Sequence, residues 1–341
     1  MIHITKHSQM NKNVLLVNIP RTPLDKQVYM QSFCQAWIDS GGASIEQNKL
    51  SKSPIIKNFL KMLAMTRIPC HKKKQAFLIC SRGGHLLKAS VPYMFKGEII
   101  PMLWDCWPDT WDTLERDLIL TKCRLCFITA SDVTKEFSKR LAQIKFVHIP
   151  EGVDINDYSK GKELQDRGID VYELGAKHNY FHKKLMEGKL HEQYKLVYHT
   201  KTKQKGLAYV YEKWETFTSK IADTKIVISF PRCMRNPMGE GEVETLTMRY
   251  WEGMLSRCVI VGHCPQELID LIGYNPIIEA DFVNPCEQII HVLHNLSAYQ
   301  TLVNKNYTTA CLYAPWHIRM KRIWKEINES LEVEKNCFSI T

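Results

Sequence analysis

Short apolar runs alternate along the chain with segments whose apolar residues recur every three or four positions. In the first half, the runs typical of buried strands lie at 13–18, 75–80, 98–103, 124–130 and 145–149. The segments with helical periodicity lie at 27–39, 54–66, 110–121 and 131–142. Strands that alternate with helices predict a parallel sheet covered by helices.

The alternation stops at Pro150 to Asp154, where a polar stretch follows, and then begins again. Strands are predicted at 169–174, 194–199, 225–230, 258–261 and 276–278, with a long loop at 231–241. Helices are predicted at 177–187, 206–221, 245–255, 265–272 and 286–331. Two such halves predict an α/β protein with two Rossmann-like domains, over 1–160 and 161–312, that face a central cleft. Ligands of open α/β sheets bind at the carboxyl ends of the strands, so we expect a site there.

Composition excludes several classes of protein. The 341 residues are 45% hydrophobic and 24% charged, which excludes a disordered chain and a small disulfide scaffold. No apolar run approaches the ~18 residues of a membrane-spanning helix, and Met1 to His7 contain no apolar signal core. We therefore expect a cytoplasmic protein whose 12 cysteines are reduced thiols.

A net charge of +10 indicates an anionic partner, and nucleic acid, an anionic membrane and a phosphorylated small molecule all fit. A metal site is not predicted. Cys123 and Cys126 are the only C-x-x-C pair, and His178 and His182 have no third ligand nearby.

The segment from Gly239 to Gly253 joins a predicted strand to a helix through a glycine-containing loop. A helix N-terminus carries free N–H groups and a partial positive charge, so it binds phosphate. Thr245 and Thr247 add hydroxyl donors, and Arg249 adds a planar fork suited to phosphate.

Glu244 and Glu252 lie at the start of this helix and two turns further along. Their spacing puts the two side chains roughly 80° apart on one side of the helix, too far along it to touch. Each carboxylate can accept hydrogen bonds from the vicinal hydroxyls of a different sugar. The alternative is a favourable N-terminal charge at Glu244 and a solvated helix residue at Glu252.

This E-x7-E pattern, followed by Gly253 to Gly262, resembles the nucleotide-sugar signature of the GT-B-type glycosyltransferases often called glycosyl transferases group 1. Ile149 to Asp154 resembles the interdomain segment of that family. The resemblance implies that the second domain holds the donor, with Glu252 on the ribose and Glu244 near the transferred sugar. It also implies that the helix from Ala314 to Leu331, within residues 313–341, crosses back onto the first domain. No cofactor is implied.

Several cations are candidates for holding the donor diphosphate. The Gly-Arg and Lys-Gly pairs that the resemblance leads us to expect are replaced by Gly175-Ala176-Lys177 and, after a further strand, Lys205-Gly206. The choice stays open among Lys177, Lys205, Arg232 and Arg235, and Arg232 follows a predicted strand directly.

Two segments of the first half are candidates for the acceptor side. Gly83 and Gly84 let the backbone approach a phosphate or sugar, and His85 follows them; the alternative is a plain turn. Trp107 offers an aromatic face for a sugar ring, and Asp105 can accept a proton from an acceptor hydroxyl. The alternative there is a tryptophan pair in the core with a capping aspartate.

Together these features predict a glycosyltransferase that moves a sugar from a nucleotide diphosphate sugar to a hydroxyl of a glycan or lipid-linked glycan, as in polysaccharide biosynthesis. We expect a retaining, metal-independent reaction; in an inverting enzyme Asp105 or His85 would be the base. A lipid-linked acceptor would bring the protein to the inner face of the cell membrane. The alternatives are an epimerase or phosphorylase on the same fold and a basic nucleic-acid-binding protein, although no known nucleic-acid module is evident.

Overall fold

The computed structural model describes residues 13–19, 28–46, 62, 75–91, 93–202, 206–208, 211, 213–235, 241 and 243–338. These residues form two compact units. The first contains the described residues up to Pro150 together with those from Trp316 onward, and the second runs from Glu151 to Pro315. Apart from residue 62, the predicted helix over 54–66 lies outside the described residues, as does Lys205.

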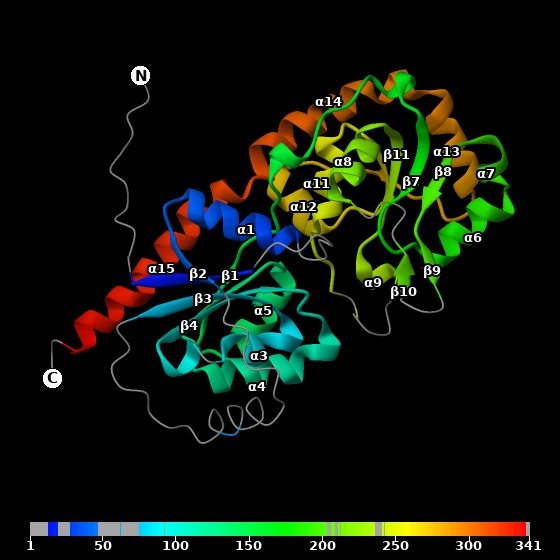
Figure 1. Ribbon diagram of the computed structural model, residues 1–341. Coiled ribbons are helices and arrows are strands. Elements are labelled where there is room, and N and C mark those ends of the chain that lie inside the picture. Colours follow the sequence, from blue (N-terminus) through cyan, green and yellow to red (C-terminus); the bar gives the residue numbers. More distant parts are fainter. Residues whose placement is uncertain are drawn as a thin grey trace, which may run out of the picture. The chain divides into compact units, whose positions relative to one another are not determined.

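The first unit is built on a parallel sheet with the strand order β2-β1-β3-β4-β5-β6 (Figure 1). Its strands are β1 (Val14–Asn18), β2 (Ala43–Glu46), β3 (Ala76–Arg82), β4 (Glu98–Trp104), β5 (Leu125–Ile128) and β6 (Lys145–His148). Its main helices are α1 (Val28–Asp39), α3 (Leu86–Ser90), α4 (Trp111–Thr121), α5 (Ser131–Arg140) and α15 (Trp316–Phe338). Every residue of β4 is buried, as expected for a central parallel strand covered on both faces.

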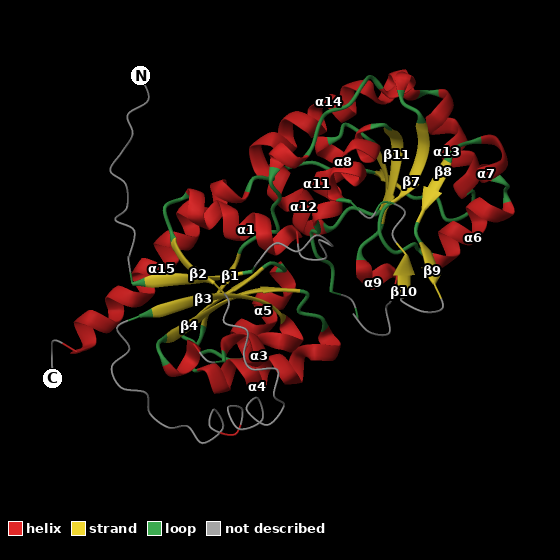
Figure 2. Cartoon of the chain, viewed as in Figure 1, coloured by secondary structure: helices red, strands yellow, loops and turns green. Residues whose placement is uncertain are grey.

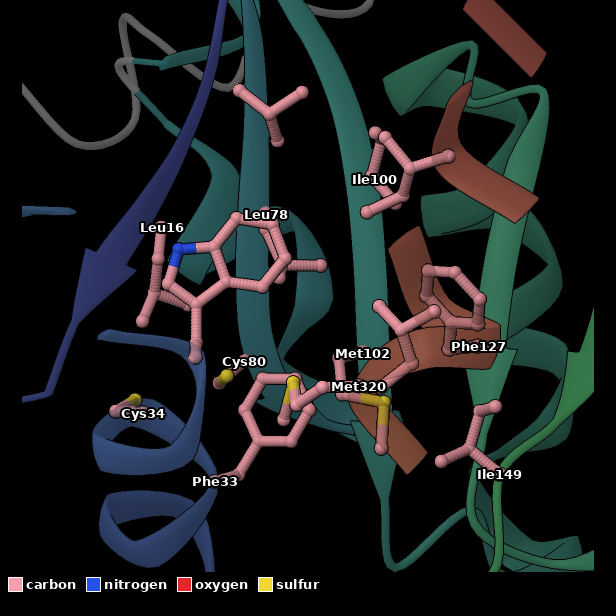
Figure 3. Close-up of a cluster of buried hydrophobic side chains, with 14 of the residues drawn as sticks. Leu16, Phe33, Cys34, Leu78, Cys80, Ile100, Met102, Phe127, Ile149 and Met320 are labelled. Atoms are coloured by element: carbon pink, nitrogen blue, oxygen red, sulfur yellow. The ribbon is translucent and has the colours of Figure 1, made fainter. Parts of the chain in front are cut away.

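Figure 3 shows the core on one face of this sheet, where Leu16, Leu78 and Ile100 of adjacent strands gather with Phe33 of α1 and Met320 of α15. Their neighbours in the sequence, Val17, Phe77 and Ile99, belong to a second core on the other face of the sheet. This period-two division is the reason that the strands are continuous apolar runs.

The C-terminal helix α15 packs on the first unit, as predicted. The ring of Trp324 stacks on Trp37 of α1, with the ring centroids 4.0 Å apart. The indole N–H of Trp316 donates to the hydroxyl of Ser32 at 3.2 Å, and that of Trp324 donates to Ser40 at 3.1 Å. Most of the interface is apolar, so burial of aromatic surface holds this helix in place.

The second unit has a parallel sheet with the order β13-β12-β11-β7-β8. Its strands are β7 (Ile169–Glu173), β8 (Leu196–Tyr198), β11 (Thr224–Ser229), β12 (Val259–Gly262) and β13 (Ile278–Glu279). Figure 2 shows helices beside this sheet; one core includes residues of α8 (Trp214–Ala222), α11 (Met248–Leu255) and α12 (Gln266–Ile272). The other includes residues of α6 (Asn179–Glu187), α7 (Leu190–Gln193) and α13 (Pro285–His294). The fold class is therefore the predicted one, with two parallel sheets covered by helices.

Three parts of the predicted element order are wrong. Residues 206–221 are not one helix: Gly206–Ala208 forms β10, antiparallel to β9 (Thr200–Thr202), and α8 begins only at Trp214. Glycine is a poor helix former, so the start of the predicted helix was its weakest part. The predicted loop after β11 contains a turn of helix, α9 (Arg232–Arg235).

The region predicted to be helical at 286–331 contains three helices, α13, α14 (Leu296–Tyr313) and α15. Pro315, which has no backbone N–H, separates the last two. Strand β2 was not predicted. It has only four residues, and most of them are exposed at the edge of the sheet. Within the part of the chain that the structure describes, no helix has the length and apolar character needed to cross a membrane.

Candidate functional site

The strand order of the second unit marks one edge of its sheet as a binding position. The chain passes from β7 outward to β8, and β11 then returns on the other side of β7. The order of the strands reverses between β7 and β11, and their carboxyl ends define the crevice in which open α/β sheets bind ligands. The loops that leave these two strands begin at Leu174 and Phe230.

Arg249 of α11 lies against the loop that leaves β7. Gly175 in this loop has a φ of +71°, and a Cβ atom there would lie 2.8 Å from the Nη1 atom of Arg249. The backbone conformation favours glycine, and a Cβ atom would displace the Arg249 guanidinium. The guanidinium of Arg249 also donates to the hydroxyl of Thr247 at 3.4 Å. The sheet edge and the first turn of α11 are therefore in direct contact.

A second arginine contacts the same loop, and Lys177 belongs to it. Arg235 of α9 donates to the carbonyl oxygen of Ala176 at 3.0 Å. Lys177 places its ammonium 4.3 Å from the centre of the Tyr198 ring and 3.1 Å from Nε2 of His182. Arg232, the first residue of α9, is exposed. Residues 174–177, here called the β7 loop, are thus surrounded by positive charge.

The start of α11 differs from the prediction. The helix begins at Met248 with Thr247 as its N-cap, three residues later than expected. Thr245 therefore lies before the helix; it is buried, and its hydroxyl is 3.3 Å from the carbonyl of Leu246. This hydroxyl donates to the backbone, whereas Thr247 is half-buried at the helix end.

Glu252 is buried, which contradicts the alternative of a solvated helix residue. It is 3% exposed, and the hydroxyl of Tyr158 donates to its Oε1 atom at 3.3 Å. Burial raises the pKa of this carboxyl from 4.5 to about 7, and the charge of Arg249 and the Tyr158 hydrogen bond oppose the shift. The carboxylate is also less exposed than expected for a group that binds ribose, because it is buried in the packing of α11.

Glu244 forms a network that the sequence analysis missed. Its Oε1 atom is 2.8 Å from Nε2 of His263, and its Oε2 atom accepts from the backbone N–H of Gln266 at 3.3 Å. The other ring nitrogen of His263 is 3.1 Å from Glu279. His263 follows β12, just as Arg232 follows β11, and this position at a strand end was the available signal. The network fixes Glu244 at the carboxyl end of β12.

The acceptor-side candidates of the first unit also lie at the ends of strands. Asp105 follows β4 and forms an ion pair with Arg82 at the end of β3, at 3.3 Å. Asp105 has a φ of +50°, which is uncommon for a residue with a side chain. Gly83 is buried, and a Cβ atom there would lie 3.0 Å from Cα of Cys106; Gly84 and the exposed His85 complete the turn before α3.

The aromatic platform predicted at Trp107 is not open. Its ring is 6% exposed, and Trp104 belongs to the apolar core with ring contacts to Tyr29 and Phe33. Trp104 is therefore a core tryptophan, as in the alternative, and Trp107 is buried as well. The alternative role for Asp105 is not the observed one: it pairs with Arg82 and adopts a left-handed conformation.

Comparison with solved structures assigns the fold. A sucrose-phosphate synthase from Thermosynechococcus elongatus is 9% identical, with a TM-score of 0.57 over 94% of this chain and 100% of that one. HepE from Anabaena, in complex with UDP and glucose, is 10% identical with a TM-score of 0.55 over 95% and 100%. A glycosyltransferase from Rickettsia africae is 12% identical with a TM-score of 0.51 over 93% and 99%. These structural neighbours are GT-B glycosyltransferases, so the chain has the predicted GT-B fold.

No family model matches the sequence, and no curated protein matches it. At such low identities the likeness defines the fold, and the chemistry must be argued from the side chains. Among the described residues, no group of three histidines, cysteines or acidic residues is arranged to hold a metal ion. The second unit brings Lys177, Arg235 and Arg249 together at the β7 loop and carries the carboxylates of Glu244 and Glu252.

Proposed function

We propose that the protein is a glycosyltransferase that transfers a sugar from a nucleotide diphosphate sugar to an acceptor hydroxyl. The observation that carries the proposal is the gathering of Lys177, Arg235 and Arg249 about the β7 loop. Guanidinium and ammonium groups are the side chains that bind phosphate best. The N-terminus of α11 begins beside them and adds a partial positive charge. The shared fold with glycosyltransferases supports the same assignment.

Leaving-group stabilisation is the main catalytic effect that we propose. When the bond between the sugar and the diphosphate breaks, negative charge develops on the phosphate oxygens. Fixed cations placed where this charge develops lower the barrier without reorganisation. In the retaining reaction the acceptor approaches from the face that the diphosphate leaves, and a phosphate oxygen takes its proton. A strong protein base is then unnecessary; in the inverting alternative Asp105 or His85 would take the proton.

The two glutamates would hold the sugars. Glu252, with Tyr158 on one oxygen, is proposed to accept hydrogen bonds from the ribose hydroxyls. Glu244, held by His263, is proposed to face the transferred sugar. Because donor hydroxyls stabilise a carboxylate, binding of the nucleotide would lower the raised pKa of Glu252.

UDP-glucose is the first donor to test, because HepE, which shares the fold, was solved with UDP and glucose and with UDP-glucose. For the acceptor we propose a glycan or lipid-linked glycan. The net charge of +10 suits an acceptor embedded in an anionic membrane surface. In that case the protein would act at the cytoplasmic face of the membrane.

The test combines binding with product analysis. Purified protein is screened by thermal shift against UDP-glucose and other nucleotide diphosphate sugars, and a ligand at 100 times its dissociation constant should add about 2.7 kcal/mol of stability. The stabilising donor is then incubated with and without glycan acceptors. Transfer to an acceptor, lost on Arg249→Met and kept on the exposed control His191→Gln, supports the proposal.

Other results separate the alternatives. Conversion of the donor sugar without any acceptor indicates an epimerase, and release of a sugar phosphate indicates a phosphorylase. Binding that responds to nucleic acid, falls steeply with salt and ignores nucleotide sugars would favour a nucleic-acid-binding protein and contradict the proposal.

A further inference from the structure

A chain of three side chains links the interior of the second unit to the β7 loop. Glu173 is the last residue of β7, and one of its oxygens lies 2.5 Å from Nδ1 of His182 on α6. The other ring nitrogen of His182, Nε2, lies 3.1 Å from the ammonium of Lys177. His182 therefore bridges a carboxylate at the end of β7 and a cation in the loop that follows this strand.

The chemistry of the end groups favours one tautomer of the neutral His182 ring. An ammonium group has only donors, so the contact with Lys177 requires a lone pair on Nε2. The proton of the neutral ring must then be on Nδ1, where it is donated to the carboxylate of Glu173. Each contact favours the same tautomer, and the three groups form one directed chain of hydrogen bonds.

Burial makes this chain more than a surface ion pair. The side chain of Glu173 is 3% exposed and that of His182 is 17% exposed. A carboxylate buried to this degree is costly unless it is paired, and a histidine between two charged groups is an expensive way to fill a core. An apolar pair would pack the same space at lower cost, which suggests that the arrangement serves the group at its outer end.

Tyr198 contacts both Lys177 and His182. Its ring centre is 4.3 Å from the ammonium of Lys177 and 4.8 Å from the ring of His182. Lysine has four rotatable bonds, and fixing them on binding a ligand costs conformational entropy. A lysine that is already held between an imidazole and an aromatic face has met this cost before the ligand arrives.

We propose that Glu173 and His182 are positioning residues, which hold the ammonium of Lys177 at the β7 loop so that it meets the donor diphosphate in a fixed place. The inference rests on the proposed function, because it needs a diphosphate at this loop. Neither residue is assigned a contact with the ligand; both act through Lys177.

The test is a double-mutant cycle on the full chain, with UDP and inorganic pyrophosphate as probes in calorimetric titrations. His182→Phe keeps the ring volume and removes both nitrogens, and it should raise the dissociation constant about tenfold. His182→Gln carries an acceptor and a donor at a similar separation and should restore binding to within about threefold. Lys177→Met should weaken binding more than His182→Phe does. Adding His182→Phe to Lys177→Met should then change little, by less than about twofold, because the chain has lost its outer end.

Two controls keep the result interpretable. His191→Gln, on the exposed side of α7, should bind like the unaltered protein. Glu173→Gln keeps the side-chain shape and removes the charge, and it should weaken binding about threefold; it reports on the same chain if His182→Phe does not fold.

The outcomes separate the two proposals. If the unaltered protein binds the probes and His182→Phe binds equally well, the positioning role is wrong while the proposed function stands. Independent, multiplicative effects of Lys177→Met and His182→Phe also overturn it. If the unaltered protein binds neither probe, the proposed function and this inference fall together.

Discussion

The burial of Glu252 leads to a prediction about stability that does not depend on any ligand. The folded protein raises the pKa of this carboxyl from 4.5 to about 7, so it retains a proton over a pH range in which the unfolded chain has lost it. Stability from this group is therefore fully present below pH 4.5 and is lost as the pH rises through about 7. A shift of this size corresponds to about 3 kcal/mol.

Glu252→Gln removes the charge and keeps the volume, and its amide oxygen can still accept from Tyr158. Relative to the unaltered protein, the variant should gain stability as the pH rises. The difference in the free energy of unfolding should grow by about 2 to 3 kcal/mol between about pH 5 and about pH 8. The comparison cancels other groups such as His199, whose pKa is lowered to about 4 by burial and by the charge of Lys177.

Urea denaturation at a series of pH values, followed by tryptophan fluorescence, measures this difference. Glu192→Gln is the matched control, since it makes the same exchange of a carboxyl for an amide at an exposed position on α7. A difference for Glu252→Gln that is constant with pH, or that falls as the pH rises, would refute the reasoning. The stabilised variant should also bind donor more weakly, because an amide is a poorer acceptor for the ribose hydroxyls.

Three further predictions follow from particular contacts. Gly175→Ala places a Cβ atom against Arg249 at a positive φ. It should weaken UDP binding by more than about tenfold in titrations and lower the free energy of unfolding by about 1 kcal/mol in urea denaturation. Unchanged binding would contradict the packing described. His263→Phe removes the partner of Glu244 and should lower kcat more than it raises KM in the transfer assay, whereas an effect on KM alone would place Glu244 away from the transferred sugar. Trp324→Ala removes a buried ring between α15 and α1 and should cost about 3–5 kcal/mol in urea denaturation, and a cost below about 1 kcal/mol would mean that α15 contributes little to the first unit.

Local pattern was sufficient for the fold class. Apolar runs and helical periodicity gave most strands and helices to within a few residues, because a strand buried on both faces must be apolar along its length. The same local pattern placed Arg232 and Lys177 in the segments that follow two strands, and residues that follow parallel strands share one edge of a sheet. Which of these side chains contact the donor stays a prediction.

Sequence alone determined the two α/β halves, the residues at their strand ends and the E-x7-E spacing. Only the tertiary structure decided that Glu252 is enclosed with Tyr158, which is 94 positions away in the chain, and that His182 links Glu173 to Lys177. Periodicity describes which face of an element is apolar, but burial and pKa depend on what packs against that face. Those partners are brought together by the order of the strands and by the path of the loops, which no local pattern encodes.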